Sequence, residues 1–325
     1  MSMKLSLVIP IYNEEKALPV LRRRLEGLLA SFVDDYEIIF VDDGSRDAGA
    51  QIIESWIKED ARVLLVGLSR NFGHQAAITA GLEHSTGDVV VIMDADLQDP
   101  PEIIPEMLRK WQQGYKVVLA ERTEREEGWL RRVMFGLFYK SFYVLSDYPV
   151  SVNSGVFGLM DRVVVSHLLT LSEQNRFLPG LRGWVGFKTA IVRYKRDARS
   201  VGKPSQSLMK LVKYGFDAIF SFSYKPLRFS FILGSIVSVL SFGYGAVLIV
   251  QRFLNINVVP GFTTVAVAVF FVGGVILMSN GIIGEYLARI YDEVKRRPLF
   301  IVERKISRDA AGEIHVQEYK NSIRS

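Results

Sequence analysis

Two long uncharged runs near the C-terminus set the tightest limit on how this chain can fold. Neither Phe229–Gln251 nor Phe253–Gly284 contains a charged side chain. Each run exceeds the roughly 20 apolar residues that a helix needs to cross a bilayer. We expect a membrane segment at 227–288, in which two spanning helices, at about 229–251 and 262–284, form a hairpin because only a short polar link at 252–260 joins them.

Basic residues on both sides of the two runs predict the orientation of this hairpin. Lys225 and Arg228 precede the first run, and Arg289 and the basic run 295–297 follow the second. The cytoplasmic flanks of membrane helices carry an excess of Lys and Arg. We therefore expect both chain termini, and the large N-terminal part of the chain, to lie in the cytoplasm.

Two segments flank the predicted hairpin. Before it, 206–226 interleaves lysines with leucine, tyrosine and phenylalanine, which is typical of an amphipathic helix in the membrane interface. A helix that faces an ordinary protein core is the alternative. After the hairpin, 289–325 is expected to be a cytoplasmic tail with one short strand at Leu299–Val302. An exposed strand of this kind can pair with a neighbouring subunit, so we expect a homo-oligomer.

The N-terminal part of the chain, 1–205, alternates short apolar runs with amphipathic stretches. The apolar runs predict strands at Leu5–Ile9, Glu37–Val41, Val63–Leu68, Val89–Met93, Val117–Ala120, Ser154–Met160 and Thr189–Tyr194. The amphipathic stretches predict helices at Glu14–Ser31, Asp47–Ile57, Gln75–Glu83 and Pro101–Gln113. Apolar strands separated by helices indicate an α/β fold with a parallel sheet covered on both faces. Such a sheet binds ligands outside the carboxyl ends of its strands.

Several classes of function are excluded by what this part of the chain lacks. The first strand is followed by "PIYNEE", not by the Gly-x-Gly-x-x-Gly of dinucleotide-binding proteins, and no P-loop sequence is present. The chain has no cysteine, which excludes a disulfide framework, a thiolate nucleophile and a cysteine-ligated metal. Nicotinamide-dependent and Walker-type chemistry are therefore not expected.

Acidic and polar residues instead follow the predicted strands. Asn13 and Glu14 follow the first, Asp43 the second, and Asp94 and Asp96 the fourth. Residues two apart on an extended chain point the same way, so Asp94 and Asp96 can converge on one ion. A divalent cation held by one or two carboxylates and by substrate phosphates is the usual arrangement for Mg²⁺. The pattern therefore favours Mg²⁺ or Mn²⁺ bound with a nucleotide diphosphate, although Asp at strand ends also makes turns and caps helices.

Longer stretches of the sequence resemble a known family. "VIPIYNEE", "IIFVDDGSRD", "LSRNFGHQAAITAGL" and "VIMDADLQDPP" together resemble the nucleotide-sugar domain of family 2 glycosyltransferases, which have the GT-A fold. With "SGVFGLMDR", "NRFLPGLRGWVGF" and the two uncharged runs, the chain is similar to polyisoprenyl-phosphate glycosyltransferases, the group of bactoprenol glucosyl transferases and dolichol-phosphate mannose synthases. The resemblance covers roughly residues 4–305.

The resemblance implies an activity as well as a fold. A cytoplasmic GT-A domain at 1–205 would transfer a sugar with inversion to a polyprenyl phosphate such as undecaprenyl phosphate in the plasma (bacterial inner) membrane, and glucose from UDP-glucose is the favoured sugar. Another donor such as GDP-mannose or a UDP-amino sugar stays open, and so does a non-catalytic membrane scaffold that only binds nucleotide sugars. No nucleic-acid partner is expected.

The resemblance also implies a set of site residues. Around the base and ribose it places Pro10, Tyr12, Glu14 and Asp43. At the metal and diphosphate it places Asp94, Asp96 and Gln98, and near the donor or acceptor phosphate it places Arg122. A basic motif of the form Arg-x-x-Gly-x-Ser-Lys follows the catalytic domain in the family.

This chain departs from the family in two segments. Arg199 matches the first residue of the basic motif, but Pro204 and Ser205 stand where Ser and Lys are expected, so Lys203 is our candidate for the second cation. Arg132 is a further candidate for the acceptor phosphate, with a solvated helix face as the alternative. The segment 155–157 lacks the carboxylate that relatives often carry, so a side chain acting as general base there is not expected. The predicted catalytic residues are Asp96, Arg122, Arg199 and Lys203.

Two further residues are expected to have structural roles. His74 stands just before a predicted helix, where a capping or structural role is favoured over catalysis. Glu285, at the end of the second uncharged run, is expected to pair with Arg289 one helical turn later.

Overall fold

The computed structural model describes residues 3–123, 154–194, 225–254, 261–309 and 311–319, which form two compact units. The first unit holds the described residues up to 194 and those from Arg297 onward. The second holds two long helices, which end before Arg297. The predicted interfacial segment 206–226 lies outside the described residues as far as residue 224.

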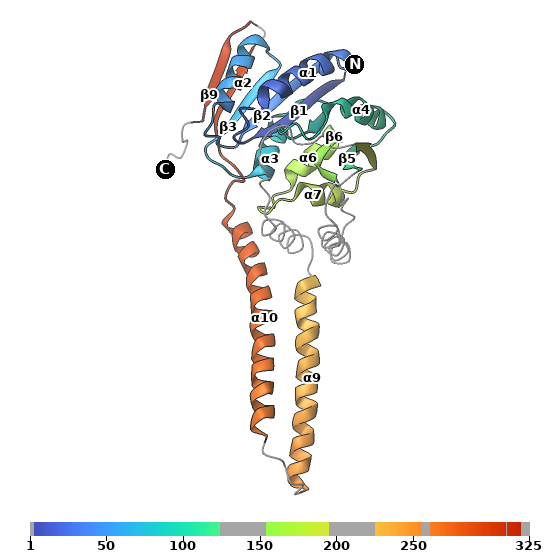
Figure 1. Cartoon of the computed structure of the whole chain (residues 1–325), viewed down its shortest axis with the longest axis vertical. Helices are drawn as coiled ribbons and strands as arrows, with labels where there is room; N and C mark the ends of the chain where they lie inside the picture. Colours follow the sequence, from blue (N-terminus) through green and yellow to red (C-terminus); the bar gives the residue numbers. More distant parts are fainter. Residues whose placement is uncertain (1–2, 124–153, 195–224, 255–260, 310, 320–325) are drawn as a thin grey trace. The chain divides into compact units, whose positions relative to one another are not determined.

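One sheet lies at the centre of the first unit, between layers of helices (Figure 1). In the part of the chain that the structure describes, its nine strands are β1 (Lys4–Ile11), β2 (Asp35–Asp42), β3 (Val63–Leu68), β4 (Val89–Ile92), β5 (Val117–Arg122), β6 (Ser154–Asp161), β7 (Thr189–Tyr194), β8 (Val302–Arg308) and β9 (Ile314–Glu318). Their order across the sheet is β7-β5-β6-β4-β1-β2-β3-β8-β9. β6 and β8 run antiparallel to their neighbours, and the remaining strands share one direction. The predicted α/β fold with a mostly parallel sheet is confirmed.

Helices cover both faces of this sheet. Their bounds are α1 (Leu18–Phe32), α2 (Gly49–Glu59), α3 (His74–His84), a 3-10 turn η1 (Pro101–Ile103), α4 (Ile104–Gln112), α6 (Arg162–Thr170) and α7 (Leu178–Trp184). One face packs against α1, α2 and α4, whose buried side chains share a core with alternate residues of the strands. The opposite face packs against α3, α6 and α7.

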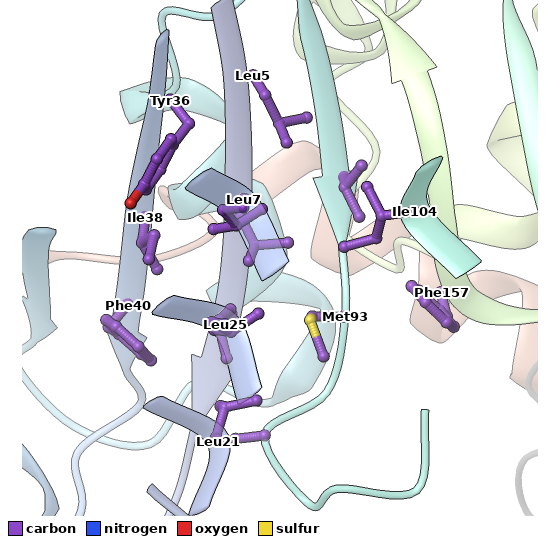
Figure 2. Close-up of a cluster of buried hydrophobic side chains, with 14 of the residues drawn as sticks. Leu5, Leu7, Leu21, Leu25, Tyr36, Ile38, Phe40, Met93, Ile104 and Phe157 are labelled. Carbon is purple, nitrogen blue, oxygen red and sulfur yellow. The ribbon is translucent and has the colours of Figure 1, made fainter. Parts of the chain in front are cut away.

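The largest apolar core lies under α1, α2 and α4. Leu5 and Leu7 of β1 are buried with Leu21 and Leu25 of α1 (Figure 2). Alternate residues of β1 face the other layer, so this strand is apolar on both faces, as expected for a central parallel strand. At about 25 cal/mol per Å² of buried apolar surface, such a core dominates the stability of the unit.

The first helix begins later than the sequence pattern predicts. Helix α1 begins at Leu18, whereas the amphipathic pattern placed its start at Glu14. Before it, the backbone N–H of Glu15 donates to Asp47 Oδ2 at 2.9 Å, and Glu15 Oε2 accepts from the backbone N–H of Ala48 at 3.1 Å. These bonds hold 13–15 against the loop that follows β2, so the chain turns before it becomes helical.

The C-terminal tail does not fold as predicted. The strand predicted at Leu299–Val302 was wrong: β8 begins at Val302 and pairs antiparallel with β3, and β9 pairs with β8. Arg304 of β8 is 2.9 Å from Glu54 of α2, and Ile306 is buried. The expected strand therefore gives no support for pairing with a neighbouring subunit, and the homo-oligomer stays a prediction.

The second unit consists of α9 (Lys225–Phe253) and α10 (Phe262–Lys295), which contact each other along the predicted hairpin. Among the described residues, one segment, Phe271–Lys295, is long and apolar enough to cross a membrane, and a shorter apolar segment, Leu227–Val237, lies in α9. The pair of spanning helices therefore stays a prediction. The ion pair between Glu285 and Arg289 is confirmed, at 2.9 Å.

One glycine is required where α3 packs closely on the sheet. A Cβ added to Gly81 would lie 2.3 Å from Val8 Cγ1 and 3.1 Å from Val41 Cγ2, and these branched side chains are stiff. We predict that Gly81→Ala lowers the free energy of unfolding by about 1–3 kcal/mol through overpacking. Chemical unfolding of the full chain in detergent measures this change.

The matched control is Gly27→Ala in α1, where an added Cβ would meet no atom within 4 Å. Alanine is favoured over glycine in a helix by up to about 1 kcal/mol, so this variant should be as stable as the parent or more stable. Equal stability of the two variants would contradict the close approach at Gly81.

Candidate active site

The carboxyl ends of the parallel strands meet at one edge of the sheet, and antiparallel β6 begins there. Pairing between β1 and β2 extends to Ile11 and Asp42, whereas pairing between β1 and β4 stops at Val8 and Ile92. The chain after β4 therefore leaves β1 where the strand order reverses. Open α/β sheets bind ligands at such a switch point.

The structure brings most of the predicted site residues to this edge. The ones that lie in or directly after the strand ends are Pro10, Tyr12, Glu14, Asp43, Asp94, Asp96, Gln98 and Arg122. Tyr12 is largely exposed, whereas Pro10 is buried within β1. Arg132, Arg199 and Lys203 lie outside the described residues.

Asp94 holds a buried carboxylate oxygen. About a third of its side chain is exposed, but Oδ1 is buried and has no hydrogen-bond partner among the described residues. His74 Nε2, at the first turn of α3, lies 3.4 Å from Asp94 Oδ1. Burial raises the pKa of Asp94 to about 6, the His74 ring opposes this change, and Asp99 and Asp96 add to it. The site thus contains a carboxylate that lacks a full counter-charge.

The turn after Asp94 has an unusual backbone. Asp96 Oδ1 accepts from the backbone N–H of Gln98 at 3.1 Å, and Leu97 between them adopts a left-handed φ of 62°. A left-handed conformation costs a residue such as leucine on the order of 1–3 kcal/mol. The buried side chain of Leu97 belongs to the apolar core, and this packing holds the turn in place.

Asp99 ends the same loop and is nearly fully buried. Its Oδ1 accepts from the hydroxyl of Tyr194 at 2.5 Å and lies 3.6 Å from Arg122 Nη2. Arg122 Nε in turn donates to the Tyr194 hydroxyl at 3.1 Å. Burial, together with the neighbouring Asp99 carboxylate, raises the pKa of Tyr194, so the hydroxyl keeps its proton. The ends of β5 and β7 are thereby joined to the loop that carries Asp94 and Asp96.

Asp43 is already engaged by the protein. Its two carboxylate oxygens accept from the backbone N–H groups of Phe72, at 2.7 Å, and Gly73, at 2.9 Å. Burial raises the pKa of Asp43, and the two N–H donors oppose that change. Asp43 therefore fixes the loop before α3. His74, which approaches Asp94, is the first residue of that helix. The predicted contact of Asp43 with the base or ribose stays a prediction.

The sequence interpretation missed three residues of the site. His74 does lie at the start of a helix as expected, but its contact with Asp94 was not predicted. Tyr194 ends a predicted strand, so its sequence context indicates a core residue. Asp99 precedes Pro100 and Pro101, so its context indicates a turn. A polar hydroxyl at the end of a strand, next to a site edge, was the signal that could have identified Tyr194.

Comparisons with known proteins identify the family. The model of Glycosyl transferase family 2 matches residues 6–169. A bactoprenol glucosyl transferase of Shigella phage SfX is 40% identical over 302 residues, which is 93% of this chain and 99% of that protein. The chain belongs to glycosyltransferase family 2. It is therefore a transferase enzyme.

Other comparisons match all or part of this glycosyltransferase. An uncharacterized glycosyltransferase of Synechocystis is 42% identical over 93% of this chain and 95% of its own length. A second family model, described as GtrB C-terminal hairpin, matches residues 225–290, which include α9 and most of α10. Among solved structures, the mannosyl-3-phosphoglycerate synthase from Rubrobacter xylanophilus aligns with a TM-score of 0.44 at 18% identity, over 67% of this chain and 72% of that chain.

The carboxylates of this glycosyltransferase suit a divalent cation. Asp94 Oδ1 is a buried oxygen without a hydrogen bond to the described residues, and Asp96 is placed two residues on. Carboxylate oxygens are the ligands that hard cations such as Mg²⁺ prefer. The donor set present at the edge of the sheet therefore fits the metal that the sequence pattern predicts.

Proposed function

We propose that this enzyme transfers glucose from UDP-glucose, with inversion, to undecaprenyl phosphate or a similar polyprenyl phosphate. The observation that carries the proposal is the end-to-end similarity to proteins named bactoprenol glucosyl transferase, at about 40% identity over 93% of this chain. The site supports the proposal because its acidic loop and Arg122 lie at the edge where an α/β sheet binds its ligand. Another donor, such as GDP-mannose or a UDP-amino sugar, would use the same chemistry.

The donor's diphosphate belongs beside the acidic loop. Asp94 and Asp96 would hold Mg²⁺ or Mn²⁺, with Gln98 at the diphosphate. The bound ion would act as a Lewis acid that stabilises the charge on the departing diphosphate. Pro10, Tyr12, Glu14 and Asp43 would surround the base and ribose. Discrimination among sugars rests on few hydrogen bonds, so a screen of nucleotide sugars identifies the donor.

The acceptor brings its own nucleophile. A phosphate monoester has a second pKa of about 6 and is mostly a dianion at pH 7, so no side chain needs to remove a proton. A phosphate oxygen forms the new bond to the anomeric carbon from the face opposite the donor's diphosphate. The bond to UDP breaks, and UDP leaves with the electron pair. Cations must offset the repulsion between the two phosphate groups, and Arg122, Arg132, Arg199 and Lys203 are the candidates.

The reaction would take place at the cytoplasmic leaflet of a bacterial inner membrane. Two spanning helices would anchor the enzyme, and the basic residues beside the interfacial segment would hold the acceptor's phosphate at the membrane surface.

The proposed reaction is tested with detergent-solubilised protein, UDP-glucose, a polyprenyl phosphate and Mg²⁺. We expect UDP release in step with a glucosylated lipid. Asp96→Ala should lose nearly all turnover and the metal-dependent part of UDP-glucose affinity, because one carboxylate cannot hold the cation against the charge of the diphosphate. Asp35→Ala, an exposed aspartate at the opposite edge of the sheet, is the control and should stay active. Full activity in EDTA would rule out the metal.

The role of Arg199 is tested in the same assay. A guanidinium can hold phosphate with two parallel hydrogen bonds, so Arg199→Ala should lower the rate by roughly 10² or more while UDP-glucose binding changes little. Arg199→Lys should recover part of the loss. Glu173→Gln, which removes the alternative carboxylate in the "SEQNRF" loop, should cost less than Arg199→Ala. If Glu173→Gln abolished turnover with both substrates still bound, a general base would replace the self-activated acceptor.

The membrane arrangement is tested by labelling single cysteines, which is simple because the chain has none. A cysteine at Ala311, in the exposed turn between β8 and β9, should react only from the cytoplasm. A cysteine at Asn257, in the link 252–260 between the two predicted spanning helices, should react only from the outside. The opposite pattern at either position would reject the proposed topology.

A further inference from the structure

The surroundings of Arg122 suggest how its guanidinium is aimed. The side chain is about three-quarters buried, and among the described residues only its Nε makes a hydrogen bond, to the Tyr194 hydroxyl. Nη2 lies on the same edge of the guanidinium as Nε, 3.6 Å from Asp99 Oδ1, and Nη1 and Nη2 make up the outer end of the group. They form the pair that can hold a phosphate group in a two-point grip.

The Tyr194 hydroxyl stands between a cation and an anion. It accepts from Arg122 Nε at 3.1 Å and donates to Asp99 Oδ1 at 2.5 Å. Arg122 Nη2 consequently stays 3.6 Å from Asp99 Oδ1, beyond the usual range of a charge-assisted hydrogen bond. The hydroxyl therefore stands between Arg122 Nε and the buried carboxylate, so that Nε bonds the hydroxyl and not Asp99.

Tyr194 is held in place without its hydroxyl. Its ring is buried in the apolar core and meets Phe157 edge to face, with centroids 5.9 Å apart. Its backbone carbonyl accepts from the N–H and from the hydroxyl of Thr123, each at 3.0 Å. Packing and backbone hydrogen bonds hold Tyr194 in place, so the strand does not depend on the hydroxyl.

We propose that Tyr194 is a positioning residue for Arg122. Its hydroxyl keeps the guanidinium off Asp99 and turned toward a phosphate of the donor or acceptor. Asp99 sets this geometry from the same loop that carries Asp94 and Asp96, so the acidic loop and the phosphate grip form one connected unit. The inference rests on the proposed function in so far as it takes a phosphate-bearing substrate as the ligand.

The test is Tyr194→Phe in the full-length protein, because this change removes the hydroxyl and keeps the ring. Without the hydroxyl, Arg122 can pair directly with Asp99 and is lost to the substrate. We expect the KM of one phosphate substrate to rise by about 10-fold or more, with thermal stability changed little. Separate KM values for UDP-glucose and for the polyprenyl phosphate tell which phosphate Arg122 contacts.

Two comparisons separate positioning from a general structural effect. Tyr36→Phe removes a hydroxyl from an equally buried tyrosine at the start of β2, at the opposite edge of the sheet, and should leave both KM values unchanged. In an Arg122→Lys background, Tyr194→Phe should add little further loss, because both changes remove the same grip. Asp99→Asn, which keeps the shape of the side chain, should also be non-additive with Arg122→Lys.

The outcomes distinguish this inference from the proposed reaction. If the parent protein makes the glucosylated lipid but the Tyr194→Phe and Arg122→Lys losses add fully, Tyr194 does not act through Arg122 and the inference is overturned. Unchanged KM values in Tyr194→Phe would overturn it as well. If no lipid product forms, but Tyr194→Phe and Arg122→Lys weaken calorimetric binding of UDP-glucose non-additively, the positioning role holds and the proposed acceptor is wrong.

Discussion

Repulsion among the three carboxylates of the loop 94–99 is the constraint on which the rest of the site depends. Two unit charges about 5 Å apart repel by roughly 3 kcal/mol at an effective dielectric constant of 20. The negative charge of Asp99 is offset within the protein, because Asp99 accepts a hydrogen bond from the Tyr194 hydroxyl and lies 3.6 Å from Arg122 Nη2. Asp96 accepts from the backbone of its own turn, and Asp94 keeps a buried oxygen without a hydrogen bond among the described residues. Asp94 Oδ1 is thus a buried carboxylate oxygen beside the switch point that a ligand with positive charge would suit.

The sheet supplies the rigid frame that keeps these groups close. β5 and β7 run in register to their last residues, so Arg122 lies opposite Tyr194. Antiparallel β6 starts at the same edge, and a Cβ at Gly155 would stand 3.6 Å from Arg122 Nη2. Arg182 of α7 is buried and donates to the carbonyl of Gly155 at 2.7 Å, and burial lowers the pKa of Arg182 to about 10. The start of β6 is therefore held by the Arg182 guanidinium and lies next to that of Arg122, which is the one near Asp99 of the acidic loop.

Sequence patterns predicted the central strands well and the last strands poorly. The runs around Val89–Ile92 and Leu5–Ile9 are apolar on both faces, and a buried parallel strand needs that composition. β8, by contrast, has the sequence "VERKISR", in which three consecutive charged residues separate Val302 from Ile306. Ile306 is the one buried residue of β8, so the apolar pattern of this strand is weak. The strand was predicted instead in the apolar stretch just before it. Its position depends on pairing with β3, more than 200 residues earlier in the chain, which no local pattern encodes.

The candidate site divides in the same way between local and distant information. Asp94 and Asp96 could be predicted because their spacing after an apolar strand is itself a local signal. The role of Arg122 came from the resemblance to the family, and its setting did not. What orients Arg122 is a hydroxyl 72 residues later in the chain and a carboxylate on a different loop. Their meeting follows from the order β7-β5-β6-β4, in which β5 lies between strands that are distant in the sequence. Residues that bind a ligand can thus leave a signature in a short stretch, whereas residues that aim them are recognised only once the strand order is known.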